Sequence, residues 1–277
     1  MFASFILALR EGIEAALIIG IVIGVLQKMD RNDLKPAVWR GTFAAGALSL
    51  LVGVILNVAG ASFEGQAEEI FEGVAMLLAA GMLTWVIFWM RKQSRNVQSE
   101  LEADVKAAAL GSGGALFAVA FLAVAREGLE LVMFLLAARF TSSALQTYLA
   151  AAAGLVVAGI LGWLLFRGSK VLNLRQFFTI TNWLLVFFAA GLVAYGVHEL
   201  NEAGWIPPVI EHIYNINFLI DENSTLGLFL KALFGYNGNP SLTETAAYLL
   251  YFIGLGSVLQ LTRNPKTRVV TARQVNQ

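Results

Sequence analysis

Long apolar stretches separated by short polar connections make up most of the chain. Seven of them are long enough to cross the hydrocarbon core of a bilayer, about 30 Å thick, as α-helices. They are predicted at about residues 2–26, 37–59, 67–90, 113–138, 145–166, 177–200 and 243–261. Hydrophobic residues form 58% and charged residues 14% of the 277, whereas soluble domains carry about 25% charge. The pattern predicts an all-α integral membrane protein with seven transmembrane helices.

Basic residues gather in alternate connections between these stretches. Only Arg139 and Lys231 occupy the opposite connections, and Arg10 and Arg126 lie inside apolar stretches. The other fifteen of the nineteen Lys and Arg residues fall on one side: Lys28, Arg31, Lys35, Arg40, Arg91, Lys92, Arg95, Lys106, Arg167, Lys170, Arg175, Arg263, Lys266, Arg268 and Arg273. Basic loops stay in the cytoplasm, so we expect the N-terminus outside and the C-terminus inside.

One charged pentapeptide occurs twice. Arg-Glu-Gly-Ile-Glu at residues 10–14 recurs as Arg-Glu-Gly-Leu-Glu at residues 126–130, each time within an apolar stretch. Each ionisable side chain at bilayer depth costs roughly 2.5–3.5 kcal/mol, and such residues usually mark an ion or proton pathway. Three spans separate the copies, so the first and fourth spans run in opposite directions. Spans 1–3 and 4–6 therefore resemble the inverted repeats of secondary transporters.

This organisation gives a single transmembrane domain with five parts. The first repeat covers about residues 1–92, a cytoplasmic link 93–112, and the second repeat 113–200. An external segment follows at 201–242, and a seventh span with a basic tail at 243–277. Apolar residues at helical intervals in the link (Val97, Leu101, Val105 and Ala108) predict an amphipathic surface helix. For the external segment two interpretations remain open, a cap that docks a partner and a partly re-entrant segment.

The charges of each pentapeptide share one helical face. At 3.6 residues per turn, Arg10, Glu11 and Glu14 fall within about 100° of arc, and Arg126, Glu127 and Glu130 do the same. Small residues occupy roughly the other side of the first span, and span 5 carries a similar stripe. The two stripes are Gly12, Ala16, Gly20 and Gly24, and Ala150, Gly154, Ala158 and Gly162. We expect tightly packed helices whose charged faces turn inward.

If the two charged faces meet, four carboxylates and two guanidiniums share one site. Its formal charge of about −2 requires protons or a bound cation in a dry interior. Oxygen ligands without thiolates suit hard cations, namely iron(III), manganese, magnesium or calcium, with iron(II) as a borderline case. Arg10 and Arg126 would then orient the carboxylates from outside the ligand shell. The alternative is a pair of buried Arg–Glu bridges that lock the fold, but each copy has one glutamate too many for that.

A second group of acids lies toward the outer ends of the third and sixth spans. Glu64, Glu68, Glu69 and Glu72 belong to span 3, and His198, Glu199 and Glu202 to span 6. Such a mouth would concentrate cations, although acids also favour helix N-termini for structural reasons. Glu72 lies a turn deeper than Glu68, so we expect Glu72, His198 and Glu199 to contact the ion, with Glu68, Glu69 and Glu202 forming the surrounding acidic mouth.

The remaining residue types exclude several function classes. The chain has no cysteine, which removes thiolate metal sites and thiol nucleophiles. It has no phosphate-binding glycine loop, zinc-hydrolase motif or serine–histidine constellation, which argues against ATP use, and no nucleic-acid partner is expected. An intramembrane carboxylate-iron enzyme is a further alternative, but such sites combine Glu with a Glu-x-x-His motif, which the pentapeptides lack. A third alternative is a metal sensor that binds the ion without transporting it.

At these residues the chain resembles the oxidase-dependent iron transporter family, in particular its bacterial inner-membrane permeases. The hallmark of that family is Arg-Glu-Gly-Leu-Glu in spans 1 and 4. Further similar segments lie at residues 71–73, 83–92, 94–96, 123–130 and 135–138, and the resemblance covers nearly the whole chain. The first copy has Ile13 in place of the usual leucine, which is a conservative change.

The resemblance implies high-affinity iron import through Glu11, Glu14, Glu127 and Glu130, with iron (Fe³⁺ or Fe²⁺) as substrate and no permanently bound cofactor. It implies a multi-pass protein of the bacterial cytoplasmic membrane that is not itself an enzyme. Periplasmic iron-binding and peroxidase- or oxidase-type proteins are the implied partners, because the chain has no redox chemistry of its own. Transport of another metal, such as manganese or lead, stays open as an alternative.

Overall fold

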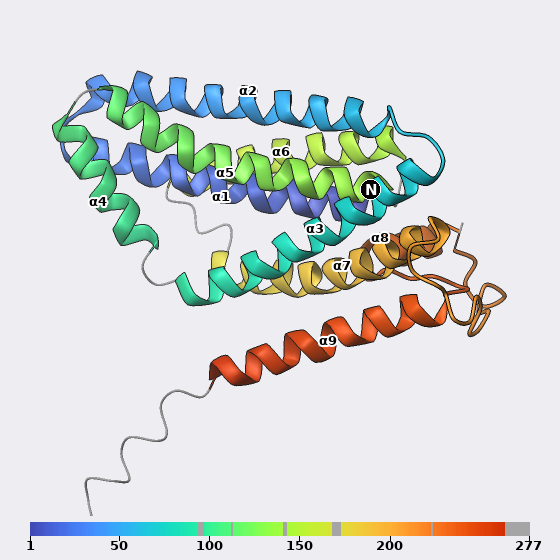
Figure 1. The fold of residues 1–277 in the computed structure, drawn as a ribbon. Coiled ribbons are helices and arrows are strands. Elements are labelled where there is room, and N and C mark those ends of the chain that lie inside the picture. Colours follow the sequence, from blue (N-terminus) through green and yellow to red (C-terminus); the bar gives the residue numbers. More distant parts are fainter. Residues whose placement is uncertain (94–96, 112, 141–142, 168–172, 223, 264–277) are drawn as a thin grey trace, which may run out of the picture.

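The structure is a computed structural model that describes residues 1–277 except 94–96, 112, 141–142, 168–172, 223 and 264–277. Within those residues every regular element is a helix (Figure 1). The helices are α1 Phe2–Lys28, a 3₁₀ turn at Asn32–Leu34, α2 Lys35–Gly60, α3 Gln66–Gln93, α4 Val97–Leu110, α5 Gly113–Phe140, α6 Ala144–Phe166, α7 Leu174–Glu202, α8 Thr225–Phe234 and α9 Leu242–Arg263.

Each of the seven predicted stretches is a helix, and every predicted end lies within three residues of the observed one. Five segments are long and apolar enough to cross a membrane: Asn32–Gly60, Gln66–Phe88, Ala144–Phe166, Leu174–Glu202 and Leu242–Leu261. The two other long helices, α1 and α5, each contain one pentapeptide. Its three charged residues make these helices more highly charged than the five segments above. The chain is therefore a multi-pass membrane protein. Arg95, Lys170, Lys266, Arg268 and Arg273, which contribute to the orientation argument, lie outside the described residues.

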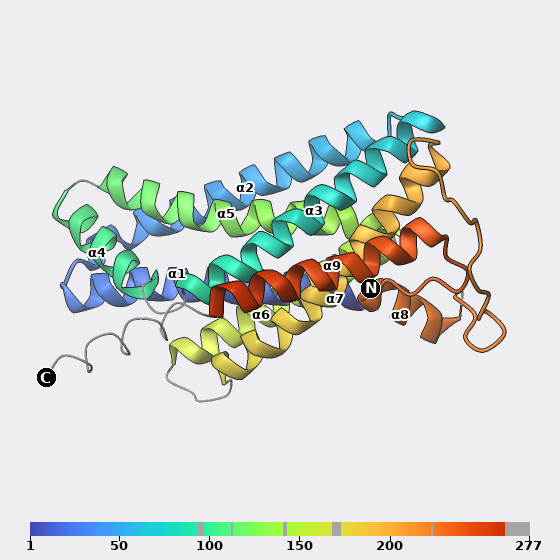
Figure 2. The ribbon, with the colours of Figure 1, turned by 60° about the horizontal axis from the view of Figure 1, so that its bottom comes forward.

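The long helices form two groups that run roughly alongside each other (Figures 1 and 2). In the first group α1 packs along α6, α2 packs along α5, and α1 also contacts α5. In the second group α3 and α9 both pack along α7, and the hydroxyls of Thr84 on α3 and Tyr251 on α9 lie 3.0 Å apart. The main connection between the groups is the contact of α3 with α5. Buried residues of α1, α3, α5 and α7 form the largest apolar cluster, including Leu7, Met76, Leu83, Phe134 and Leu192.

Small residues allow α1 and α6 to approach closely, as the stripes predict. A Cβ added at Gly12 would lie 2.6 Å from the Cβ of Ala158, and one added at Gly162 would lie 2.6 Å from that of Ala16. At Gly154 an added Cβ would lie 2.5 Å from the backbone oxygen of Phe5. Gly24 departs from the prediction, because nothing lies within 4 Å of its added Cβ.

Replacing Gly154 by alanine is expected to lower the thermal unfolding midpoint of the purified protein. The new methyl group meets backbone atoms of Phe5 and Leu9, which cannot move aside, and overpacking of this kind costs about 1–3 kcal/mol. The matched control is Gly159→Ala in the same helix, where nothing lies within 4 Å. Equal midpoints for the two variants would contradict the close α1–α6 contact.

The link between the repeats contains the amphipathic helix predicted there. Val105 and Ala108 of α4 are buried against the ends of α1 and α5 with Val22, Leu26 and Leu116. Arg31 Nη1 donates a hydrogen bond of 2.6 Å to the backbone oxygen of Ala109. The apolar face of α4 therefore covers protein, at the end of the bundle opposite to α8 (Figure 1).

The external segment folds back against α7. Its helix α8 ends at Gly235, which has a left-handed backbone (φ 66°) and lies against Gly191: a Cβ added at Gly191 would lie 2.7 Å from the Cα of Gly235. The Tyr195 hydroxyl donates a 2.7 Å hydrogen bond to the backbone oxygen of Tyr236. Gly191 precedes the end of α7 by eleven residues, or about 16 Å of helix. The segment therefore reaches back along α7 by about three helical turns.

Candidate metal centre

The two pentapeptides meet between α1 and α5. One carboxylate oxygen from each of Glu11, Glu14 and Glu127 lies within 4.8 Å of the other two. Glu11 and Glu127 are buried, and Glu14 is partly buried. Residues more than a hundred positions apart in the chain therefore supply one cluster of oxygen atoms, as expected if the charged faces turn toward each other.

In the first copy a completely buried arginine is paired with both glutamates of its own helix. The Arg10 guanidinium pairs with the Glu11 carboxylate through Nη1, and its Nη2 lies 2.9 Å from Glu14 Oε1. Arg10 is 0% exposed and Glu11 2% exposed. The second oxygen of Glu11, Oε2, is buried and accepts no hydrogen bond in the described part of the chain. That oxygen has unused capacity to bind a cation.

The second copy is arranged differently. Arg126 Nε donates a 2.9 Å hydrogen bond to Glu130 Oε1, and the side chain of Arg126 is 35% exposed. Its guanidinium carbon lies 5.8 Å from the centre of the Trp85 ring on α3. Arg126 thus holds Glu130, while Glu127 contributes its oxygen to the cluster with Glu11 and Glu14. The two copies share a sequence, but only Arg10 is sealed from solvent.

The motif glycines let a neighbouring helix pack behind each charged face. Gly12 faces Ala158 of α6, and Gly128 of α5 faces Ser49 of α2, whose hydroxyl would overlap an added Cβ. The charged residues therefore point away from these contacts and toward the other motif. Four carboxylates and two guanidiniums in this interior leave a formal excess of negative charge, which requires protons or a hard cation bound by oxygen atoms.

The outer acids form a separate group. Glu72 lies beside Gly73, whose added Cβ would be 2.9 Å from the backbone oxygen of Gly196, so α3 and α7 nearly touch there. Glu72 is close enough to interact electrostatically with Glu68 and Glu199, and Glu69 is similarly close to Glu199. Acids of α3 and α7 therefore lie near one another, and Glu64 is exposed just before the start of α3.

His198 contacts one acid of this group and one acid outside it. Its Nε2 lies 3.3 Å from Glu202 Oε1, and its Nδ1 lies 3.5 Å from Oε2 of Glu244 on α9. Glu244, which no motif in the sequence singles out, is 2% exposed. An acid in the first turn of a helix has an ordinary structural explanation. The only feature of the sequence that could have drawn attention to Glu244 is its position inside the last apolar stretch. Burial, followed by the nearby carboxylate of Glu244, raises the pKa of Tyr214 above its usual value.

Comparison with known proteins identifies the family. A sequence profile described as the iron permease FTR1 family matches residues 1–263. The chain belongs to that family. FTR1 members are named for iron permeation, so the chain is a transporter by family and not an enzyme. The resemblance that the doubled pentapeptide carries is thereby confirmed.

Bacterial members of the FTR1 family resemble the chain over most of its length. The ferrous iron permease EfeU of Escherichia coli O6:K15:H31 (strain 536) is 39% identical over 256 residues, which are 91% of this chain and 93% of the relative. The ferrous iron permease EfeU of Yersinia pestis is 37% identical over 91% of each chain. No solved structure matches the chain.

Proposed function

We propose that the protein moves iron ions across the bacterial cytoplasmic membrane into the cell. The observation that carries the proposal is the cluster of Glu11, Glu14 and Glu127, whose oxygens lie within 4.8 Å of one another. Carboxylate oxygens suit iron(III) and accept iron(II). Family membership and the names of the relatives point to iron in preference to manganese, lead or another metal cation.

The arginines make this site suitable for transient binding. Arg10 compensates part of the charge of Glu11 and Glu14, and Arg126 does so for Glu130. A site with four uncompensated carboxylates would hold a polyvalent cation too strongly to release it. In this proposal Glu11, Glu14 and Glu127 ligate the ion, and Glu130 joins when its bond to Arg126 opens. Iron is the cargo and no permanently bound cofactor takes part.

The proposed topology has seven spans, an external N-terminus and two inverted repeats of three. The pairing of helices supports the repeat. Exchanging α1, α2 and α3 for α5, α6 and α7 converts the α1–α6 contact into the α5–α2 contact, and both are among the most extensive in the protein. The same exchange maps the α3–α7 contact onto itself, at Gly73 and Gly196. Glu72, Glu199 and His198 would receive iron at the outer end from periplasmic iron-binding and peroxidase- or oxidase-type partners.

Reconstitution in liposomes tests the function directly. Iron influx, measured with iron(II) and iron(III) separately, should exceed that of protein-free vesicles, and excess manganese, zinc or lead should compete weakly. Influx no greater than that of empty vesicles would overturn the proposal. Equal competition by manganese or lead would favour transport of another metal cation.

The orientation can be tested with single cysteines, because the chain has none of its own. Glu211 in the external segment and Lys106 on α4 are both exposed. A membrane-impermeant maleimide should label Glu211→Cys in intact spheroplasts and Lys106→Cys only after the membrane is permeabilised. Labelling of Lys106→Cys in intact spheroplasts would reverse the topology.

A further inference from the structure

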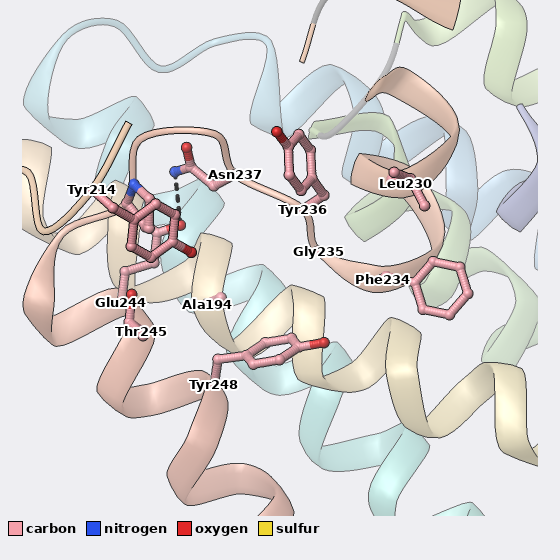
Figure 3. A pocket seen from close by; sticks show the side chains of 11 residues that line it. Ala194, Tyr214, Leu230, Phe234, Gly235, Tyr236, Asn237, Glu244, Thr245 and Tyr248 are labelled. Carbon is pink, nitrogen blue, oxygen red and sulfur yellow. Dashed lines mark hydrogen bonds between the residues drawn. The ribbon is translucent and has the colours of Figure 1, made fainter. Parts of the chain in front are cut away.

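A cavity of about 260 Å³ lies at the outer end of the bundle, away from the pentapeptides. Its walls come from α7, α8, α9 and the segments on either side of α8 (Figure 3). Polar groups on this wall include Tyr214, Asn237, Glu244, Thr245 and Tyr248. The cavity thus combines polar groups of α9 with polar groups from the segments before and after α8.

Glu244 is the charged group of this cavity. Its Oε1 accepts a 2.8 Å hydrogen bond from Asn237 Nδ2, which Figure 3 shows as a dashed line. Its Oε2 is buried and makes no hydrogen bond in the described part of the chain, and His198 Nδ1 is 3.5 Å away. A charge-assisted hydrogen bond is about 2.7–2.9 Å long, so the carboxylate is only weakly compensated. Burial of such a carboxylate is costly without a closer partner.

The spacing of these two atoms is that of neighbouring ligands on a metal ion. Ligands about 2.1 Å from a first-row metal lie roughly 3–3.5 Å from each other, and the separation here is 3.5 Å. Metal-binding histidines usually place their other ring nitrogen against a carboxylate, and metal-binding carboxylates accept a further hydrogen bond. His198 has Glu202 at 3.3 Å and Glu244 has Asn237 at 2.8 Å. Both supporting contacts are therefore already in place.

Tyr214 lies at the same cavity, and its ring is drawn beside the Asn237–Glu244 pair in Figure 3. A carboxylate and an imidazole together suit iron and other borderline cations.

We propose that Glu244 Oε2 and His198 Nδ1 form a second metal site beside Tyr214, in which iron binds before it reaches the pentapeptides. Its place in transport rests on the proposed function, whereas metal binding at Glu244 does not. Metal binding and iron influx are therefore measured separately.

Terbium(III) serves as the probe, because it is a hard cation whose luminescence is excited through a nearby tyrosine. The starting protein is the full chain with Glu11→Gln and Glu127→Gln, which silences the inner cluster. This protein should still bind terbium, with tyrosine-excited emission that Tyr214→Phe reduces. Adding Glu244→Gln, which preserves the length of the side chain and an acceptor for Asn237, should weaken binding at least about tenfold. The matched control is Glu211→Gln, an exposed acid of the same external segment.

Equal terbium affinity of the Glu244→Gln and Glu211→Gln proteins would overturn the second site, as would absence of tyrosine-excited emission from the starting protein. If Glu244→Gln fails to fold, His198→Gln provides the same comparison. In the otherwise native chain, Glu244→Gln should raise the iron concentration for half-maximal influx and leave the maximal rate nearly unchanged. If Glu244→Gln loses terbium binding but the native chain shows no iron influx, the transport function is refuted and the second metal site is supported.

Discussion

Replacing Arg10 by methionine is expected to prevent the protein from accumulating in folded form, whereas Arg126→Met should fold. Arg10 is 0% exposed and paired with Glu11 and Glu14, so its loss leaves two carboxylates buried without their cation. Breaking a buried pair in this way costs about 3–5 kcal/mol. Arg126 is 35% exposed, so its removal opens a smaller gap in the interior than the removal of the fully buried Arg10. Yield in the monodisperse gel-filtration peak and the thermal unfolding midpoint measure the difference.

A compensating variant separates charge from packing. Adding Glu14→Gln to Arg10→Met removes one of the unpaired charges, so part of the lost yield should return. Equal yields for Arg10→Met and Arg126→Met would show that the burial of Arg10 does not carry the stability assigned to it.

Replacing Glu127 by glutamine is expected to abolish iron influx while the protein remains folded. Glu127 brings the α5 oxygen to the cluster with Glu11 and Glu14, and an amide has no charge to offer a cation. The loss should exceed the roughly 10- to 100-fold that removal of an outer-shell partner costs. Glu130→Gln should reduce influx less, because Arg126 already holds that carboxylate. Influx into liposomes, normalised to reconstituted protein, is the measurement.

The control for Glu127→Gln is Asp104→Asn, which removes an exposed acid of α4 and should transport at the native rate. Native influx by Glu127→Gln would remove the cluster from the transport path. Unchanged influx by both Glu127→Gln and Glu130→Gln would assign the second pentapeptide a purely structural role.

The helices and the meeting of the pentapeptides were predictable from the sequence. The length of each apolar stretch predicts where a helix lies, because a helix needs about 20 apolar residues to cross a bilayer. The small-residue stripes also predicted the close approach of Gly12, Ala16, Gly154 and Ala158. The helical-wheel angles placed Glu11, Glu14 and Glu127 on facing surfaces, since one residue in 3.6 returns to the same side of a helix.

Other features depend on how the helices pack and could not be predicted from the sequence. The pentapeptides read alike, yet Arg10 is sealed and Arg126 is not, because exposure depends on how neighbouring helices cover each motif. Glu244 lies far in sequence from His198, and no periodicity connects the two. The return of Gly235 to Gly191 depends on a left-handed backbone at the end of α8, which residue patterns in a long loop do not specify.

The division of the bundle into two groups separates two properties of a transporter. Glu11, Glu14 and Glu127 belong to α1 and α5 in one group, whereas Trp85, Glu72 and His198 belong to α3 and α7 in the other. Sliding of the second group would change which side of the membrane reaches the carboxylates without altering the distances between them. The strength of iron binding at this inner cluster and the rate of the transport cycle are then set by different helices. Substitutions along the α3–α5 contact would change the speed of the transport cycle and leave the strength of iron binding largely intact.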